Sequence, residues 1–84
     1  MNQLINFREE FELVNQTKEI VANCNTLNVI NIGTATAIIN GIEIGSGQQY
    51  YVQGNENEFN VTRYRISFTG GGTESVQVIR KIYN

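Results

Sequence analysis

Short runs of apolar and β-branched residues, separated by turn residues, are repeated along the chain. The clearest run is 63–68, in which Tyr64, Ile66 and Phe68 alternate with polar residues and therefore share one face of a strand. Residues 48–53 and 75–83 also have the composition of strands. No segment beyond the N-terminus has helical periodicity, so the pattern predicts about seven or eight short strands.

The strongest local signal is the dipeptide Asn40-Gly41, which separates the apolar run 34–39 from Ile42-Glu43-Ile44. Both central residues of a type I′ turn need a positive φ, and asparagine and glycine tolerate this best. The sequence therefore predicts a β-hairpin with Asn40 and Gly41 at its tip.

The N-terminal part of the chain allows two interpretations. A helix would place four apolar residues on one face: Leu4, Phe7, Phe11 and Val14. However, 11–14 and 19–22 are short apolar runs on either side of a polar turn, which is typical of a hairpin of strands. We favour the hairpin, preceded by an N-terminal arm of residues 1–8.

The remaining residues, 9–84, are interpreted as a single all-β domain. Within it, Val29 and Ile30 are adjacent apolar residues in an otherwise alternating strand, which predicts a β-bulge. A small antiparallel β-sandwich or barrel is the architecture that closes such a series of strands and protects their edges.

The small size of the chain points to a source of stability outside its own core. A domain of 84 residues buries only about 60% of its unfolded surface. Cys24 is the only cysteine and histidine is absent, so neither an internal disulfide nor a conventional zinc site is expected. Association with further copies or with a larger assembly is therefore the expected source of extra stability.

Charge and hydropathy argue against two classes of partner. The net charge is −2 and the few basic residues form no patch, so we expect no nucleic-acid partner. The cationic residues Arg63, Arg65, Arg80 and Lys81 are interpreted as lying on solvated strand faces. No apolar run reaches the roughly 20 residues of a membrane span, so we expect no membrane partner.

Candidate chemistry is sparse, and the chain is not expected to be an enzyme. The commonest general base is missing because there is no histidine. Cys24 lies between two asparagines without a nearby cation to lower its pKa, and is interpreted as a small buried apolar residue. No catalytic residue, metal ligand or cofactor is therefore assigned.

Interface residues are the more promising candidates. Leu4, Ile5 and Phe7 of the arm have little room in so small a core and could dock on a neighbour. Tyr50 and Tyr51 are adjacent in a strand, so they point to opposite faces and at least one leaves the domain's own core.

A resemblance to a known family adds to this picture. The segments that carry it are Asn31-Ile32-Gly33, Asn40-Gly41-Ile42, Gly54-Asn55-Glu56-Asn57-Glu58, Tyr64-Arg65-Ile66-Ser67-Phe68 and Val78-Ile79-Arg80-Lys81-Ile82-Tyr83. Over residues 27–83 the chain resembles small all-β structural proteins in the virions of tailed bacteriophages, of the kind found in Bacteroides-like phages. One departure is Gly45-Ser46-Gly47, where proline would be common. The resemblance implies a β-sandwich building block of capsids, tails or fibres.

We therefore expect an auxiliary capsid, head-fibre or tail adaptor subunit that is made in the host bacterial cytoplasm and incorporated into the virion. Its partners would be other virion proteins and further copies of itself. One alternative is a carbohydrate-binding module that uses Tyr50 or Tyr51 to bind a surface glycan. Another is a small inhibitor that binds one bacterial host protein.

Overall fold

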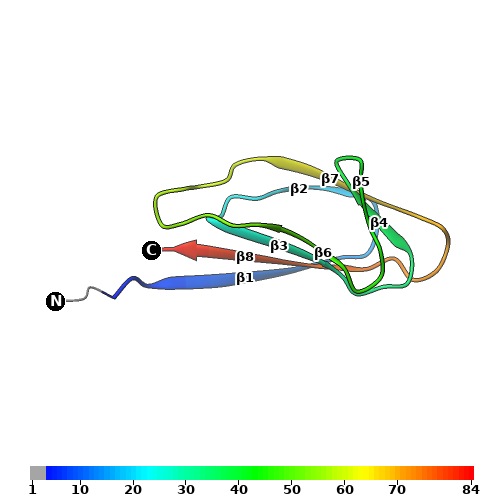
Figure 1. Ribbon diagram of the computed structural model, residues 1–84, viewed down its shortest axis with the longest axis horizontal. Coiled ribbons are helices and arrows are strands. Elements are labelled where there is room, and N and C mark those ends of the chain that lie inside the picture. Colours follow the sequence, from blue (N-terminus) through cyan, green and yellow to red (C-terminus); the bar gives the residue numbers. More distant parts are fainter. Residues whose placement is uncertain (1–3) are drawn as a thin grey trace.

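The computed structural model describes residues 4–84 and contains two four-stranded antiparallel sheets. The strands are β1 (Phe7–Val14), β2 (Lys18–Val21), β3 (Thr26–Asn31), β4 (Thr36–Ile39), β5 (Ile42–Ile44), β6 (Gln49–Val52), β7 (Arg63–Thr69) and β8 (Val76–Tyr83). The two sheets pack face to face as layers of a sandwich (Figure 1). The prediction of an all-β sandwich is therefore confirmed, and the alternative of a closed barrel is not found in residues 4–84.

The strand order is that of a rolled hairpin. One sheet has the order β1-β8-β3-β6 and the other has the order β2-β7-β4-β5. The first strand pairs with the last, the second with the seventh, the third with the sixth and the fourth with the fifth. A long hairpin wound up in this way is a jelly roll, an architecture shared by viral capsid domains, lectins and cupins.

The core between the two sheets is formed by the inward-facing residues of each strand, which alternate with outward-facing ones. In β8, Val76 and Val78 are fully buried, and Leu27 and Val29 occupy the equivalent face of β3. The opposite sheet contributes buried aliphatic side chains from β4 and β7, and the buried Cys24 confirms the expectation of a small apolar residue. Apolar burial of this kind is the main force that holds the two sheets together.

The predicted N-terminal hairpin is wrong. β1 pairs with β8 in one sheet, whereas β2 pairs with β7 in the other. The polar turn between them therefore carries the chain from one layer to the other. A hairpin turn and a crossing between sheets have the same local turn composition. Only the long-range pairing of β1 with β8 and of β2 with β7 distinguishes the two.

The arm proposed for residues 1–8 overlaps with a strand. β1 begins at Phe7, which pairs with Tyr83, and Arg8 pairs with Ile82. Residues 4–6 precede β1, and residues 1–3 lie outside the described part of the chain.

The hairpin at Asn40-Gly41 is confirmed. Ile39 pairs with Ile42 across the turn, and φ is 47° at Asn40 and 85° at Gly41. Both values are positive, as a type I′ turn requires.

The bulge predicted at Val29 and Ile30 is wrong. β3 keeps a regular register with β8 from Thr26 to Asn31, with Val29 in the core and Ile30 on the outer face. The irregularity comes just after the strand, where the N–H groups of Ile32 and Gly33 both donate to the carbonyl of Ser75. The apolar Ile30 therefore marks an outward-facing position and not a change of face.

Candidate functional site

The outer face of the β1-β8-β3-β6 sheet carries an unusual number of apolar side chains. On β1, Phe7, Phe11 and Leu13 point away from the core and are 51%, 65% and 55% exposed. On β8, Tyr83 lies opposite Phe7, and Ile79 lies opposite Phe11. We call these five residues the outer apolar band. Phe11, Leu13 and Ile79 are neighbours, and the Glu9–Lys81 pair separates them from Phe7 and Tyr83. Exposed apolar side chains gathered on two adjacent strands mark this face as an interaction surface.

β1 has the reverse of the usual pattern, because three of its four charged residues face the interior side of the sheet and Glu9 faces outward. Arg8, Glu10 and Glu12 share the face of the buried Val14. A shift of one residue in register would reverse these faces, yet Val14 opposite Val76 fixes the observed register. Three apolar positions of β1 are thus exposed on its outer side.

Glu12 is held on the inner side by two cations. Its carboxylate is hydrogen-bonded to Lys18, and it lies 3.0 Å from the guanidinium of Arg80. The hydrogen bond from Lys18 is the main reason why the pKa of Glu12 is lowered, and Arg80 adds to this against a partial desolvation that raises it.

Arg80 is buried, contrary to the expectation of a solvated strand face. Its guanidinium donates to the carbonyls of Val21 at 3.0 Å and Ala22 at 2.9 Å, in addition to its ion pair with Glu12. A buried cation needs such partners to offset its lost hydration. The sequence alone contains no signal for these partners because they belong to distant segments.

One end of the outer apolar band has a cation above its aromatic rings. The ammonium of Lys81 lies 4.3 Å from the ring centroid of Phe7 and 5.1 Å from that of Tyr83. The two rings are themselves in an edge-to-face arrangement with centroids 6.3 Å apart. These contacts hold the exposed rings in place, and an ordered aromatic surface loses less entropy when it binds a partner.

Tyr50 and Tyr51 lie on opposite faces of β6, as predicted. Tyr50 packs against the core with its ring edge-to-face to Tyr64, at a centroid distance of 5.9 Å. Desolvation is the main reason why the pKa of Tyr50 is raised. Tyr51 is 53% exposed on the outer face, so it is the tyrosine available to a partner.

Tyr51 borders a hollow of about 190 Å³ that is also lined by Glu9, Thr26, Asn28, Ile79 and Lys81. The amide nitrogen of Asn28 donates to Gln49, while its buried Oδ1 has no hydrogen-bond partner among residues 4–84. The hollow therefore combines an aromatic ring, an amide side chain and charges of both signs.

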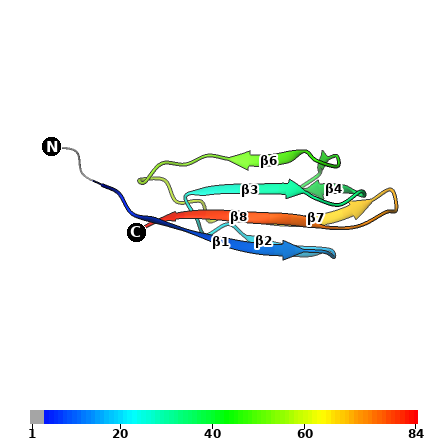
Figure 2. The same ribbon diagram turned by 90° about the horizontal axis from the view of Figure 1, so that it is seen from below.

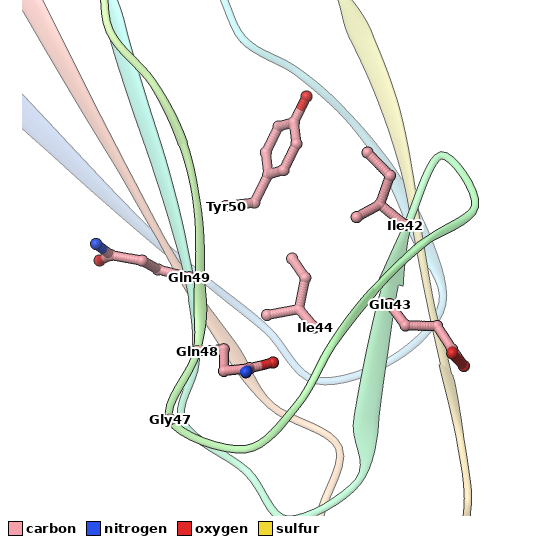
Figure 3. A pocket seen from close by; sticks show the side chains of 7 residues that line it. All are labelled: Ile42, Glu43, Ile44, Gly47, Gln48, Gln49 and Tyr50. Atoms are coloured by element: carbon pink, nitrogen blue, oxygen red, sulfur yellow. The ribbon is translucent and has the colours of Figure 1, made fainter.

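A second, open groove of about 700 Å³ lies between the edge strands β5 and β6. Figure 3 shows Ile42, Ile44 and Tyr50 pointing toward one another across it, while Glu43 and Gln49 point away. The groove is where the two sheets separate at this side of the sandwich.

The remaining interface candidates precede β1. Leu4 is 92% exposed and Ile5 is about half exposed. The sequence therefore identifies Leu4, Ile5 and Phe7 as outward-facing residues and leaves the choice between Tyr50 and Tyr51 open, which the structure decides for Tyr51. It does not identify Phe11 and Leu13, which it places in a hairpin. The signal that could have identified them is their odd spacing from Val14, the single buried residue of β1.

The structure offers no obvious metal centre in the part of the chain that it describes. No group of three or more cysteine and acidic side chains lies together among residues 4–84. Nor do these residues form a helix that is long and apolar enough to cross a bilayer.

Comparison with known proteins finds no match to any family model, curated protein or solved structure. The function is therefore argued from the surface described above.

Proposed function

We propose that the chain is a structural subunit of a bacteriophage virion, such as an auxiliary capsid, head-fibre or tail adaptor protein, and that it acts through protein–protein assembly and has no catalytic role. The observation that carries this proposal is the outer apolar band on a sheet edge, with three of its residues on β1 each more than half exposed. Large exposed apolar side chains grouped on one face are typical of protein–protein interaction sites.

The fold is consistent with this role. Jelly rolls build viral capsids, but they also occur in lectins and cupins, so fold by itself does not select a function. The outer apolar band favours assembly over catalysis or ligand transport, because it lies on the open outer face of a sheet and only Ile79 also lines the hollow beside Tyr51.

The proposal is tested on particles of the phage that carries the gene. We expect mass spectrometry of density-purified virions to find the chain at a fixed copy number relative to the major capsid protein. A chain present only in the soluble fraction of infected cells, and absent from particles, contradicts the proposal.

A matched pair of variants locates the surface. Phe11→Ser and Phe59→Ser each remove one exposed phenylalanine, but Phe59 lies in the loop between β6 and β7 and is not a member of the outer apolar band. In a phage that lacks its own copy of the gene, we expect plasmid-borne Phe11→Ser to be depleted from particles at least about tenfold and Phe59→Ser to be incorporated normally.

Removal of residues 1–6 tests the arm. A deletion of residues 1–8, the full arm expected from the sequence, would also remove Phe7 and Arg8, which pair with β8. The shorter deletion leaves β1 complete, so we expect an unchanged circular dichroism spectrum together with reduced incorporation. Normal incorporation of this variant removes Leu4 and Ile5 from the proposed interface.

Glycan binding is a second candidate, favoured by the hollow beside Tyr51. An aromatic ring next to amide and charged side chains is the combination that sugar recognition uses. A glycan array probed with the wild type and with Tyr51→Ala tests it. Binding that is lost in the variant supports this function, and the absence of any bound glycan contradicts it.

A further inference from the structure

β1 exposes a complete set of backbone hydrogen-bonding groups on its far side. The N–H of Asn84 donates to the carbonyl of Asn6 at 3.0 Å, so Asn6 directs its backbone groups toward β8. These directions alternate along an antiparallel strand. Phe7, Glu9, Phe11 and Leu13 therefore direct their N–H and C=O groups away from the sheet, at the edge that Figure 2 shows beyond β8.

The edge is long for one that is left open. β1 has eight residues, whereas the other edge strands, β2, β5 and β6, have four, three and four. Proteins keep exposed edges short because a long edge is a template for pairing with another chain.

We propose that β1 of a second copy of this chain pairs with β1 in an antiparallel arrangement across a two-fold axis. The β1-β8-β3-β6 sheets of the two copies then form one continuous sheet of eight strands. The register places Glu9 at the axis, so that Phe7 faces the partner's Phe11 and Arg8 faces the partner's Glu10. This inference deepens the proposed function by naming a partner of the same surface, and it rests on that function.

The apolar residues support this register. Because the two-fold axis repeats every contact, Phe7 meets Phe11 twice, and Ile5 before the strand meets Leu13 twice. All four residues are at least about half exposed in the single chain. Cross-strand aromatic and aliphatic pairs are the contacts that stabilise neighbouring strands.

The charges support it as well. Arg8 lies opposite the partner's Glu10 at two symmetric places, so the interface contains two pairs of opposite charge. Glu9 meets its own copy at the axis, but each Glu9 is opposite Lys81 on its own β8. Lys81 thus supplies a positive charge on the neighbouring strand, next to the like-charge pair at the axis.

The two registers that are shifted by two residues from this one bring like charges together. A shift of two residues in one direction places Arg8 against Arg8 and Phe7 against Glu9. The same shift in the other direction places Glu10 against Glu10 and Phe11 against Glu9. Like charges directly opposite each other destabilise a strand pair, so Arg8 and Glu10 disfavour these two registers.

Light scattering of the purified full chain after size exclusion tests the dimer. We expect a mass twice the 9.5 kDa of one chain at high concentration. Arg8→Glu places like charges together at two sites, so the dissociation constant is expected to rise roughly tenfold or more. The double variant Arg8→Glu with Glu10→Arg restores both opposite pairs and should restore the dimer.

Arg65→Glu is the control, because it makes the same change of charge at an exposed position of β7, in the other sheet. It should dimerise like the wild type. A wild-type chain that is monomeric at every concentration, or an Arg8→Glu variant that dimerises normally, overturns the proposed pairing.

Single cysteines test the register. In hydrogen-bonded antiparallel pairs the Cα atoms lie about 5.5 Å apart, within reach of a disulfide. Glu9→Cys should therefore cross-link to its own copy under oxidised glutathione. Glu10→Cys should not, because the two residues 10 are offset along the strands beyond the about 7 Å limit. Cross-linking of Glu10→Cys in place of Glu9→Cys contradicts the register, and the buried Cys24 contributes no background.

These measurements use the purified chain, so their outcome is separate from that of the virion test. A monomeric chain that still co-purifies with particles overturns the dimer alone. A chain that dimerises as described and is absent from particles overturns the virion function alone.

Discussion

Arg80 and Glu12 form an ion pair with a separation of 3.0 Å at the side of the sandwich where β1 and β2 lie. The same guanidinium donates to the carbonyls of Val21 and Ala22 at the end of β2. Since β1 and β8 belong to one sheet and β2 to the other, a single side chain connects the two layers. The open β1–β2 side of the sandwich is therefore stabilised by polar contacts in addition to apolar packing.

Replacement of Arg80 by methionine should destabilise the fold. Arg80→Met keeps the volume but leaves Glu12 and two carbonyls without this partner, at an expected cost of about 2–4 kcal/mol in the free energy of unfolding. Urea denaturation followed by circular dichroism measures it. Arg65→Met, at an exposed position, should change stability by less than about 0.5 kcal/mol. Equal stability of the two variants contradicts the role of Arg80.

The ion pair also makes the free energy of unfolding depend on pH in the acid range. Lys18 and Arg80 lower the pKa of Glu12 below its ordinary value of 4.5, so its folded pKa lies below its unfolded pKa. Glu12 then contributes stability that is present above the unfolded pKa and is lost as pH falls through the folded pKa. Glu12→Gln removes this titration.

We expect Glu12→Gln to be less stable than the wild type at pH 7, with a difference that narrows as pH falls below about 4.5. Thermal unfolding between pH 2 and 7 measures both curves. Parallel curves over the whole range would show that Glu12 contributes nothing to acid sensitivity.

Asn31 links the turn after β3 to the β4–β5 hairpin. Its amide is 1% exposed and donates to the carbonyls of Ala35 at 2.8 Å and Ile44 at 2.9 Å, and it accepts from the N–H of Gly33 at 3.0 Å. Asn31→Leu keeps the size and leaves these three groups unpaired, so a loss of about 2–4 kcal/mol is expected in urea denaturation. Asn28→Leu on the outer face of the same strand should cost less than about 1 kcal/mol.

Gly33 has no room for a side chain. A Cβ there would lie 2.2 Å from the carbonyl oxygen of Thr73, which is backbone and cannot move aside easily. Gly33→Ala should therefore lower the midpoint of urea denaturation by an amount equivalent to at least about 2 kcal/mol. At Gly45 the nearest atom is the flexible end of Gln48, so Gly45→Ala should be nearly neutral, and similar losses at both sites would contradict this steric account.

The sequence predicted the elements whose evidence is local. The β4–β5 hairpin follows from the two residues at its tip, and β7 follows from the alternation of Tyr64, Ile66 and Phe68. The connection between β1 and β2 could not be derived in this way. Its turn composition fits a hairpin as well as a crossing between sheets, and the choice is made by β8 and β7, more than 40 residues away.

The polar residues of the interior could be predicted least. Arg80 and Asn31 are buried because distant carbonyls accept their hydrogen bonds, and no spacing in the sequence identifies those carbonyls. The interaction surface was found in part. Lack of room in a small core predicts Phe7, and strand parity predicts that one of Tyr50 and Tyr51 faces outward. Phe11 and Leu13 require the register with β8.

The pairing of the first strand with the last has a consequence for synthesis on the ribosome. β8 lies between β1 and β3, so a nascent chain that has not reached Val76 leaves these two strands without a common neighbour. Most of the first sheet therefore forms only after translation of the C-terminal strand, and folding must await long-range contacts, which makes it slow. Until then the apolar residues of β1 are available to chaperones and to other nascent chains. Neighbouring ribosomes on the same messenger RNA carry nascent chains with the same exposed β1.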